Sequence, residues 1–149
     1  IGAPNKIAKA CTKIQGQFTS GTSSITQRAA ISALRKKPDF TKKMNIEFMK
    51  RRDMAVKMLE KIPNIKFNIP QGAFYLFPDV SYFFGKTDGT TTINSSDDLC
   101  MYLLNTCYVA LVAGTPFGNP ECVRISYAAS EENLLEAIRR IKNQLSKLK

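Results

Sequence analysis

Arg124 is the residue whose type and spacing most directly indicate chemistry. It lies in the sequence VRISY of residues 123–127, where three apolar side chains alternate with Arg124 and Ser126. Alternation with a period of two is typical of a half-buried strand, so Arg124 and Ser126 should lie on the polar face. A strand guanidinium beside the glycine-rich segment 114–118 can hold a carboxylate through two parallel hydrogen bonds. The strand pattern alone leaves open an exposed edge arginine or a structural ion pair.

The absence of histidine excludes several kinds of site. Without His there is no Ser-His-Asp or Cys-His nucleophile pair and no zinc site with His ligands, and we predict no metal site. The four cysteines form no CxxC motif, which predicts free thiols in a reducing compartment. Each is expected to be buried as a small apolar side chain. They are Cys11, Cys100, Cys107 and Cys122.

The charge is strongly basic and unevenly distributed. The chain has 22 Lys and Arg against 12 Asp and Glu, a formal charge of +10, and the excess is concentrated in residues 35–61. Such a stretch could bind nucleic-acid phosphates. A solvated helix face is the preferred interpretation, because no RNP-type aromatic motif accompanies the charges, and we expect no nucleic-acid partner. No stretch supplies the ~20 apolar residues of a membrane span, so no membrane partner is expected either.

The elements that would position Arg124 follow from the hydrophobic pattern. Apolar residues recur at helical spacing in five segments and alternate or cluster in four short ones, which predicts the α/β class, more narrowly α+β, with a small sheet covered by helices. In the last helix, apolar residues step by 4, 3, 4 and 3 from Leu134 to Leu148, as in a core-facing stripe, a partner-binding face being the alternative. Helices are expected to begin near Pro4, Ser24, Pro38, Ser95 and Ser130, with a loop at residues 16–24 and strands at residues 65–69, 73–77, 109–112 and 123–127.

Seven short motifs occur in the order found in the C-terminal part of an aspartate aminotransferase-like enzyme, which the chain resembles. That family is class I, fold type I, and uses pyridoxal 5′-phosphate. The resemblance covers essentially all 149 residues, and seven motifs in register are far more specific than any one of them. They are IGAP (1–4), QFTS (17–20), QRAA (27–30), PQGAFY (70–75), GTPFG (114–118), VRISYA (123–128) and SEENL (130–134).

The resemblance implies both a fold and a function. Residues 39–149 would form the C-terminal small domain of a PLP-dependent transferase fold, and residues 1–38 would be the helical tail of the large, cofactor-binding domain. The full-length protein would be a cytoplasmic, homodimeric aminotransferase. It would transfer an amino group between an L-amino acid, expected to be aspartate, and a 2-oxo acid such as 2-oxoglutarate.

The resemblance also implies roles for single residues. Arg124 matches the family's arginine that binds the substrate α-carboxylate, and Phe74 is expected to pack near the same pocket. Thr19 and Ser20 are expected near the dimer interface and the cofactor phosphate of the neighbouring subunit.

No catalytic residue is expected in this chain. The family's Schiff-base lysine lies in a motif just before the segment that reads Ile-Gly-Ala-Pro here, so we expect the chain to be a piece of a longer protein and inactive alone. The alternatives are another fold type I enzyme of different specificity and a basic nucleic-acid-binding module.

Overall fold

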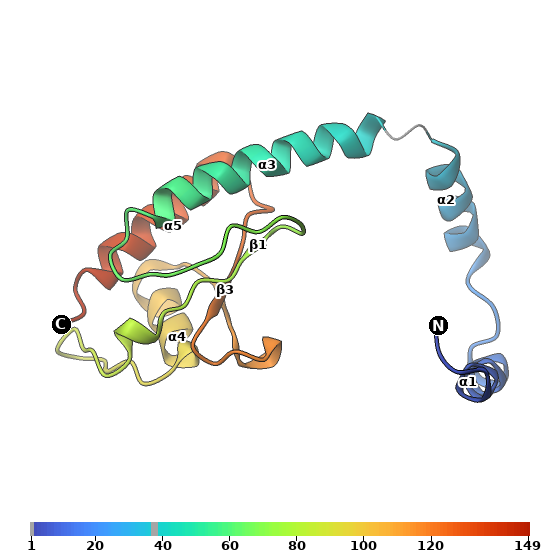
Figure 1. Ribbon diagram of the computed structural model, residues 1–149, viewed down its shortest axis with the longest axis horizontal. Helices are drawn as coiled ribbons and strands as arrows, with labels where there is room; N and C mark the ends of the chain where they lie inside the picture. Colours follow the sequence, from blue (N-terminus) through green and yellow to red (C-terminus); the bar gives the residue numbers. More distant parts are fainter. Residues whose placement is uncertain (1, 37–38) are drawn as a thin grey trace. The chain divides into compact units, whose positions relative to one another are not determined.

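Three helices precede the sheet in the computed structural model, which describes residues 2–36 and 39–149 (Figure 1). They are α1 (Asn5–Phe18), α2 (Ser24–Arg35) and α3 (Asp39–Leu59). Pro38, expected to open the third helix, lies outside the described residues. The chain divides into two compact units, Ile1–Lys42 and Lys43–Lys149. Their assignment to a large and a small domain, with a boundary at residue 38, stays a prediction.

The first unit contains α1 and α2, and neither helix has a buried residue. The predicted loop start at residue 16 is wrong, because α1 continues through Gly16 to Phe18. A glycine inside a helix costs only about 1 kcal/mol relative to alanine, which the neighbouring helical residues can offset. Ser23 is the N-cap residue of α2, but its side chain makes no capping hydrogen bond.

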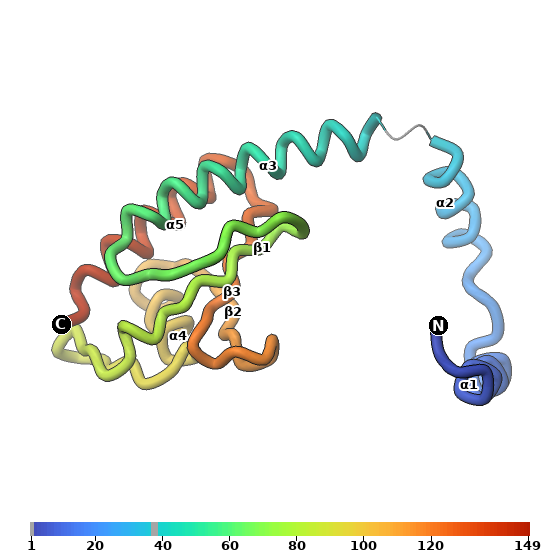
Figure 2. The backbone as a smooth tube through the Cα atoms, viewed as in Figure 1, coloured from blue at the N-terminus to red at the C-terminus, as the bar shows by residue number. Residues whose placement is uncertain are grey.

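The second unit is built on a three-stranded antiparallel sheet with strand order β1-β3-β2 (Figure 2). The central strand is β3 (Val123–Ser126), flanked by β1 (Tyr75–Leu76) and β2 (Val112–Ala113). Buried and less buried side chains alternate along β3, which confirms the alternation predicted from the sequence. Arg124 therefore occupies the middle of the sheet, not an outer edge.

Strands β1 and β3 are shorter than predicted, and the strand predicted at residues 109–112 is displaced to Val112–Ala113. The strand predicted at residues 65–69 is absent. This segment makes a single isolated bridge, in which the backbone N–H of Asp79 donates to the carbonyl of Lys66 at 2.8 Å. Pro70, which follows, has no N–H to continue a ladder, and its carbonyl accepts a hydrogen bond from Arg52 at 3.2 Å. The alternating pattern thus marks an extended segment packed on the core without a full strand partner.

Two capped helices follow β1, α4 (Ser96–Cys107) and α5 (Glu131–Leu145). Ser95 Oγ accepts a hydrogen bond from the N–H of Asp98 at 3.1 Å, and Ser130 Oγ accepts one from Asn133 at 3.2 Å. Both predicted N-caps are confirmed, and such caps are each worth about 1 kcal/mol.

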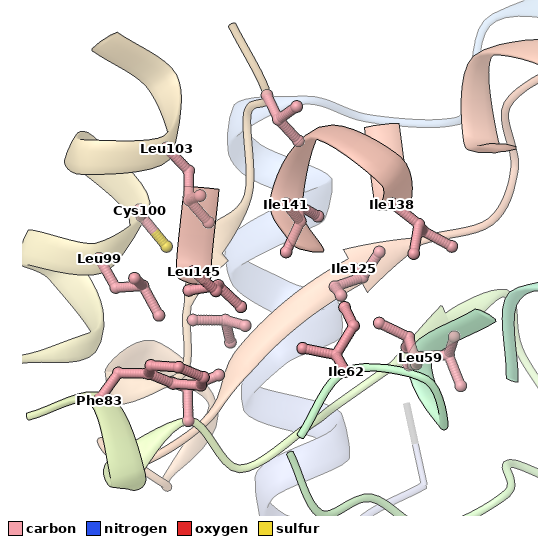
Figure 3. Packing of buried hydrophobic residues seen from close by; sticks show 14 of the residues in the cluster. Leu59, Ile62, Phe83, Leu99, Cys100, Leu103, Ile125, Ile138, Ile141 and Leu145 are labelled. Atoms are coloured by element: carbon pink, nitrogen blue, oxygen red, sulfur yellow. The ribbon is translucent and has the colours of Figure 1, made fainter. Parts of the chain in front are cut away.

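The core lies between the sheet and helices α3, α4 and α5 (Figure 3). The predicted stripe on the last helix is part of it, because Leu134, Ile138 and Ile141 are all at most 3% exposed. Leu59 of α3 and Leu99 of α4 are also buried and pack in the same cluster. The stripe is therefore a core-packing face, and burial of this apolar surface holds the sheet in place.

The four cysteines are free, as predicted. Cys100 and Cys122 are buried and Cys107 is half-buried, and burial raises the pKa of the Cys100 thiol to about 11. The expectation of burial is wrong for Cys11, which is exposed because α1 buries no side chain in this chain. Among the described residues, no helix combines the length and apolarity needed to cross a bilayer.

Candidate functional site

Arg124 projects from the central strand on the face opposite the core. Its neighbours Val123 and Ile125 are buried, whereas Arg124 is half-buried. Across the described residues, no carboxylate or carbonyl oxygen forms an ion pair or hydrogen bond with its guanidinium. The alternative of a structural ion pair is therefore wrong within the described chain. All five N–H donors of the guanidinium remain available to an anion from outside.

Two aromatic rings lie against this guanidinium. The Arg124 Cζ atom is 4.5 Å from the ring centroid of Tyr75 and 4.3 Å from that of Phe117. Both distances are within the ~6 Å range of a cation–π interaction, which stabilises the charge without using an N–H donor. A third ring, Phe77, meets Phe117 edge-on at 6.3 Å. The cation is thus held by rings and not by a counter-ion.

A tight turn presents Phe117 to Arg124. A short 3-10 helix, Thr115–Phe117, lies between Gly114 and Gly118. A Cβ atom at Gly114 would overlap the backbone oxygens of Asn119 and Cys122, and Gly118 has a φ of +84°, so both positions favour glycine. The N–H of Gly114 donates to the carbonyl of Cys122 at 2.8 Å, which ties the turn to the start of β3. The glycine-rich segment therefore places a ring beside the strand arginine.

Phe74 precedes Tyr75 in the chain, and the described cation–π contacts of Arg124 do not include its ring. Its ring is tilted against Tyr75 at 4.4 Å and stacks on Phe48 of α3 at 6.0 Å. Its backbone carbonyl accepts a hydrogen bond from the N–H of Tyr127 at 2.9 Å. Phe74 therefore supports the neighbouring Tyr75, and its side chain is 38% exposed beside the site.

The buried phenol of Tyr127 fastens the turn before β1. Tyr127 is 2% exposed, and its hydroxyl donates a hydrogen bond to the carbonyl of Ala73 at 3.0 Å. Burial raises the pKa of Tyr127, and the charge of Arg52 opposes that rise only in part. The side chain consequently stays protonated as the donor that this contact requires.

Thr19 and Ser20, the other predicted site residues, end α1 in the first unit. Their backbone N–H groups both donate to the carbonyl of Gln15, at 2.9 and 3.0 Å. The Thr19 hydroxyl donates to the same oxygen at 3.4 Å, and Ser20 has a φ of +56°, the left-handed conformation that commonly ends a helix. Among the described residues, the Ser20 hydroxyl has no partner. The structure brings Arg124 and Phe74 into one neighbourhood, whereas Thr19 and Ser20 belong to the other unit.

The lysines that the structure describes offer no candidate for covalent catalysis. Every described lysine is exposed except Lys86, which is half-buried over the ring of Tyr82 at 4.6 Å. A catalytic lysine needs its pKa lowered by burial or a nearby cation. At Lys50 the effect is the opposite, since a hydrogen bond and the charge of Glu131 raise its pKa.

The basic stretch at residues 35–61 is partly engaged within the second unit. Lys50 of α3 forms an ion pair with Glu131 of α5 at 2.8 Å, and Arg52 forms one with Asp53 at 2.8 Å. Arg52 also donates to the carbonyl of Pro70. Lys50 therefore joins α3 to α5, and Arg52 joins α3 to the segment at Pro70.

Sequence reasoning missed Tyr75 and Phe117 as partners of Arg124. Tyr75 is opposite Ser126 in the β1–β3 register, so its ring falls on the same face as Arg124. Phe117 occupies the turn that the glycine spacing predicted. Tyr75 lies in the motif PQGAFY and Phe117 in GTPFG, but neither motif shows that its ring meets Arg124, because that contact depends on the β1–β3 register and on the turn.

Residues 1–141 match the family described as aminotransferase class I and II. Curated relatives include a bifunctional aspartate aminotransferase and glutamate/aspartate-prephenate aminotransferase of Petunia hybrida, 46% identical over 100% of this chain and 32% of its own length. An aspartate aminotransferase of Pinus pinaster is 42% identical over 97% of the chain and 30% of its own length.

Solved structures give the same result for the fold. A crystal structure of an aspartate aminotransferase from Rhizobium meliloti has a TM-score of 0.88 and 40% identity, covering 99% of this chain and 37% of that one. An aromatic aminotransferase from Pyrococcus horikoshii has a TM-score of 0.79 and 30% identity, covering 97% and 37%. The chain thus spans about a third of the length of the relatives it matches. As the resemblance predicted, the chain belongs to the aminotransferase class I and II family.

Proposed function

We propose that the whole protein containing this chain is an aminotransferase that uses pyridoxal 5′-phosphate. It transfers an amino group between an L-amino acid, aspartate being the proposed donor, and a 2-oxo acid such as 2-oxoglutarate. Membership of the family and relatives named aspartate aminotransferase support the activity and the donor. The single structural observation that carries the proposal is the Arg124 guanidinium, half-buried between rings and without an acceptor in the described chain.

In this proposal Arg124 binds the substrate α-carboxylate. Two parallel N–H donors would hold both carboxylate oxygens, which fixes the position and rotation of the adjoining Cα. Orientation of this kind lowers the barrier of a reaction at Cα because the bound amino acid no longer samples unproductive poses. Amino acids and 2-oxo acids share the carboxylate at this position, so one guanidinium serves both substrates.

Pyridoxal 5′-phosphate, when bound, supplies an electron sink for charge that develops at Cα. The described residues fit the carboxylate part of such a site and do not by themselves form the cofactor part. For a phosphate they offer the unpartnered Ser20 hydroxyl, since the backbone N–H groups of Thr19 and Ser20 already bond to Gln15. We propose that Ser20 and Thr19 contribute to the phosphate end across a homodimer.

We further propose that residues 1–149 alone do not transaminate. No described lysine is buried, and the contact with Glu131 raises the pKa of Lys50. Added pyridoxal phosphate should therefore give no stoichiometric, lysine-linked absorbance band with this chain, and a band that maps to one lysine would contradict the proposal.

We also propose a cytoplasmic location, which the four free cysteines favour. Recovery of the native protein from an oxidising compartment would argue against it.

The test of the proposed function is substitution of Arg124 in the full-length protein. Loss of a hydrogen-bonded charge pair costs about 2–5 kcal/mol, so Arg124→Ala should raise the KM for aspartate and for 2-oxoglutarate by about 30-fold to about 4,000-fold. Arg124→Lys keeps the charge but loses the bidentate geometry. Its KM values should therefore lie between those of the parent and those of Arg124→Ala.

Arg139→Ala is the matched control. Arg139 is an exposed arginine of α5 that pairs with Glu136 and makes no described contact with Arg124 or its two rings. Its substitution should leave both KM values within twofold of the parent. An unchanged KM for Arg124→Ala would remove Arg124 from substrate binding.

A further inference from the structure

We infer that Tyr75 and Phe117 are positioning residues that set the Arg124 guanidinium in place before any substrate arrives. This inference rests on the proposed role of Arg124 in binding a carboxylate. The guanidinium Cζ lies 4.5 Å from the Tyr75 centroid and 4.3 Å from the Phe117 centroid. An arginine side chain has several rotatable bonds, and ordering it on binding costs affinity unless it is ordered beforehand.

The two rings are held by the backbone and not by a ligand. Tyr75 is fixed in β1 by its pairing with Ser126, and its ring contacts Phe74, which stacks on Phe48 of α3. Phe117 is fixed by the turn in which its N–H donates to the carbonyl of Gly114 at 2.8 Å. The rings therefore keep their positions in the chain without substrate, as a pre-organised site requires.

Rings suit this task better than an acid would. A carboxylate beside Arg124 would stabilise its charge but would compete with the substrate carboxylate for the same N–H donors. An aromatic face stabilises the cation electrostatically and accepts none of those N–H bonds. The absence of an internal acceptor, within the residues described, is what leaves the guanidinium free for an incoming carboxylate.

The exposure of Phe117 indicates that its ring is not needed for the core. Phe117 is 47% exposed and does not belong to the buried cluster, so removal of its ring leaves the hydrophobic core intact. Phe77 contacts it edge-on from one side, which restricts its motion. An exposed ring fixed against an arginine is more useful for orienting that arginine than for stabilising the fold.

The experiment uses the full-length holoenzyme with aspartate and 2-oxoglutarate. Phe117→Leu should raise both KM values about fivefold, which corresponds to about 1 kcal/mol, while kcat stays within twofold. Phe117→Tyr restores a ring and should recover most of the lost affinity. Tyr82→Leu is the control, since Tyr82 also carries a cation over its ring, Lys86, but lies outside the site; it should leave KM unchanged.

A second background separates positioning from general structure. In the Arg124→Ala protein, Phe117→Leu should add no further rise in KM, because the ring would act only through the guanidinium. An equal rise in that background, or no rise with Arg124 present, would overturn the inference. If Arg124→Ala itself left KM unchanged, the proposed function of Arg124 would fail instead. Thermal unfolding of each variant should show a Tm close to that of the parent.

Discussion

Replacement of Tyr127 by phenylalanine tests how the turn that carries Phe74 and Tyr75 is held. The Tyr127 hydroxyl donates to the Ala73 carbonyl at 3.0 Å, and the side chain is 2% exposed. One such hydrogen bond contributes about 0.5–1.5 kcal/mol net. Ala73 itself is exposed, so its carbonyl can bond to water once the phenol is removed, and the larger penalty of a buried unsatisfied group does not apply. We expect Tyr127→Phe to lower the free energy of unfolding by about 1 kcal/mol.

Urea unfolding of the 149-residue chain, followed by circular dichroism, measures this change. With an m-value of about 1–3 kcal/mol/M, the midpoint should fall by roughly 0.3–1 M while m stays constant. Tyr82→Phe is the control, because Tyr82 is 49% exposed and its ring is retained over Lys86. An unchanged midpoint for Tyr127→Phe, or an equal fall for Tyr82→Phe, would refute the role assigned to the Tyr127 hydroxyl.

Two further predictions concern the core of the second unit. Leu59→Ala should lower the free energy of unfolding by about 2–5 kcal/mol, because Leu59 is 0% exposed. Leu135→Ala on α5 should lower it far less, because Leu135 is 41% exposed. Equal urea midpoints for the two variants would contradict this prediction. Burial, aided by Asp88, raises the pKa of Tyr102 from 10.0 to about 12. A raised acid pKa in the folded state means that stability is intact below about pH 10 and is lost as pH rises towards about 12. In urea titrations at increasing pH, Tyr102→Phe should remove this loss of stability above about pH 10. If the stability of the parent and of Tyr102→Phe fell in parallel with pH, Tyr102 would not be its cause.

The helices of the second unit were predictable because their signals are local. Ser95 and Ser130 each precede an apolar pattern of helical period, and both cap their helices as predicted. The α5 stripe was predictable for the same reason, since a period of 3.6 residues assigns one face to the core.

The strands and the ring pair were less predictable because they depend on contacts between distant segments. The extent of β1 is limited to Tyr75–Leu76 by its pairing with β3, which no local pattern reports. Arg124 was found from alternation within its own strand. Tyr75 and Phe117 meet it only because a register and a turn bring three segments together.

In the first unit the apolar faces of the helices are not buried. Apolar residues recur along α1 and α2 at helical spacing, yet Ile14, Phe18 and Leu34 are 60%, 84% and 86% exposed. Helices of 14 and 12 residues are only marginally stable in water without packing of an apolar face. Cys11 lies on α1 and is exposed for the same reason, since neither α1 nor α2 has a buried residue. The hydrophobic pattern therefore predicts which face of a helix is apolar, whereas burial of that face depends on a packing surface that the pattern does not report.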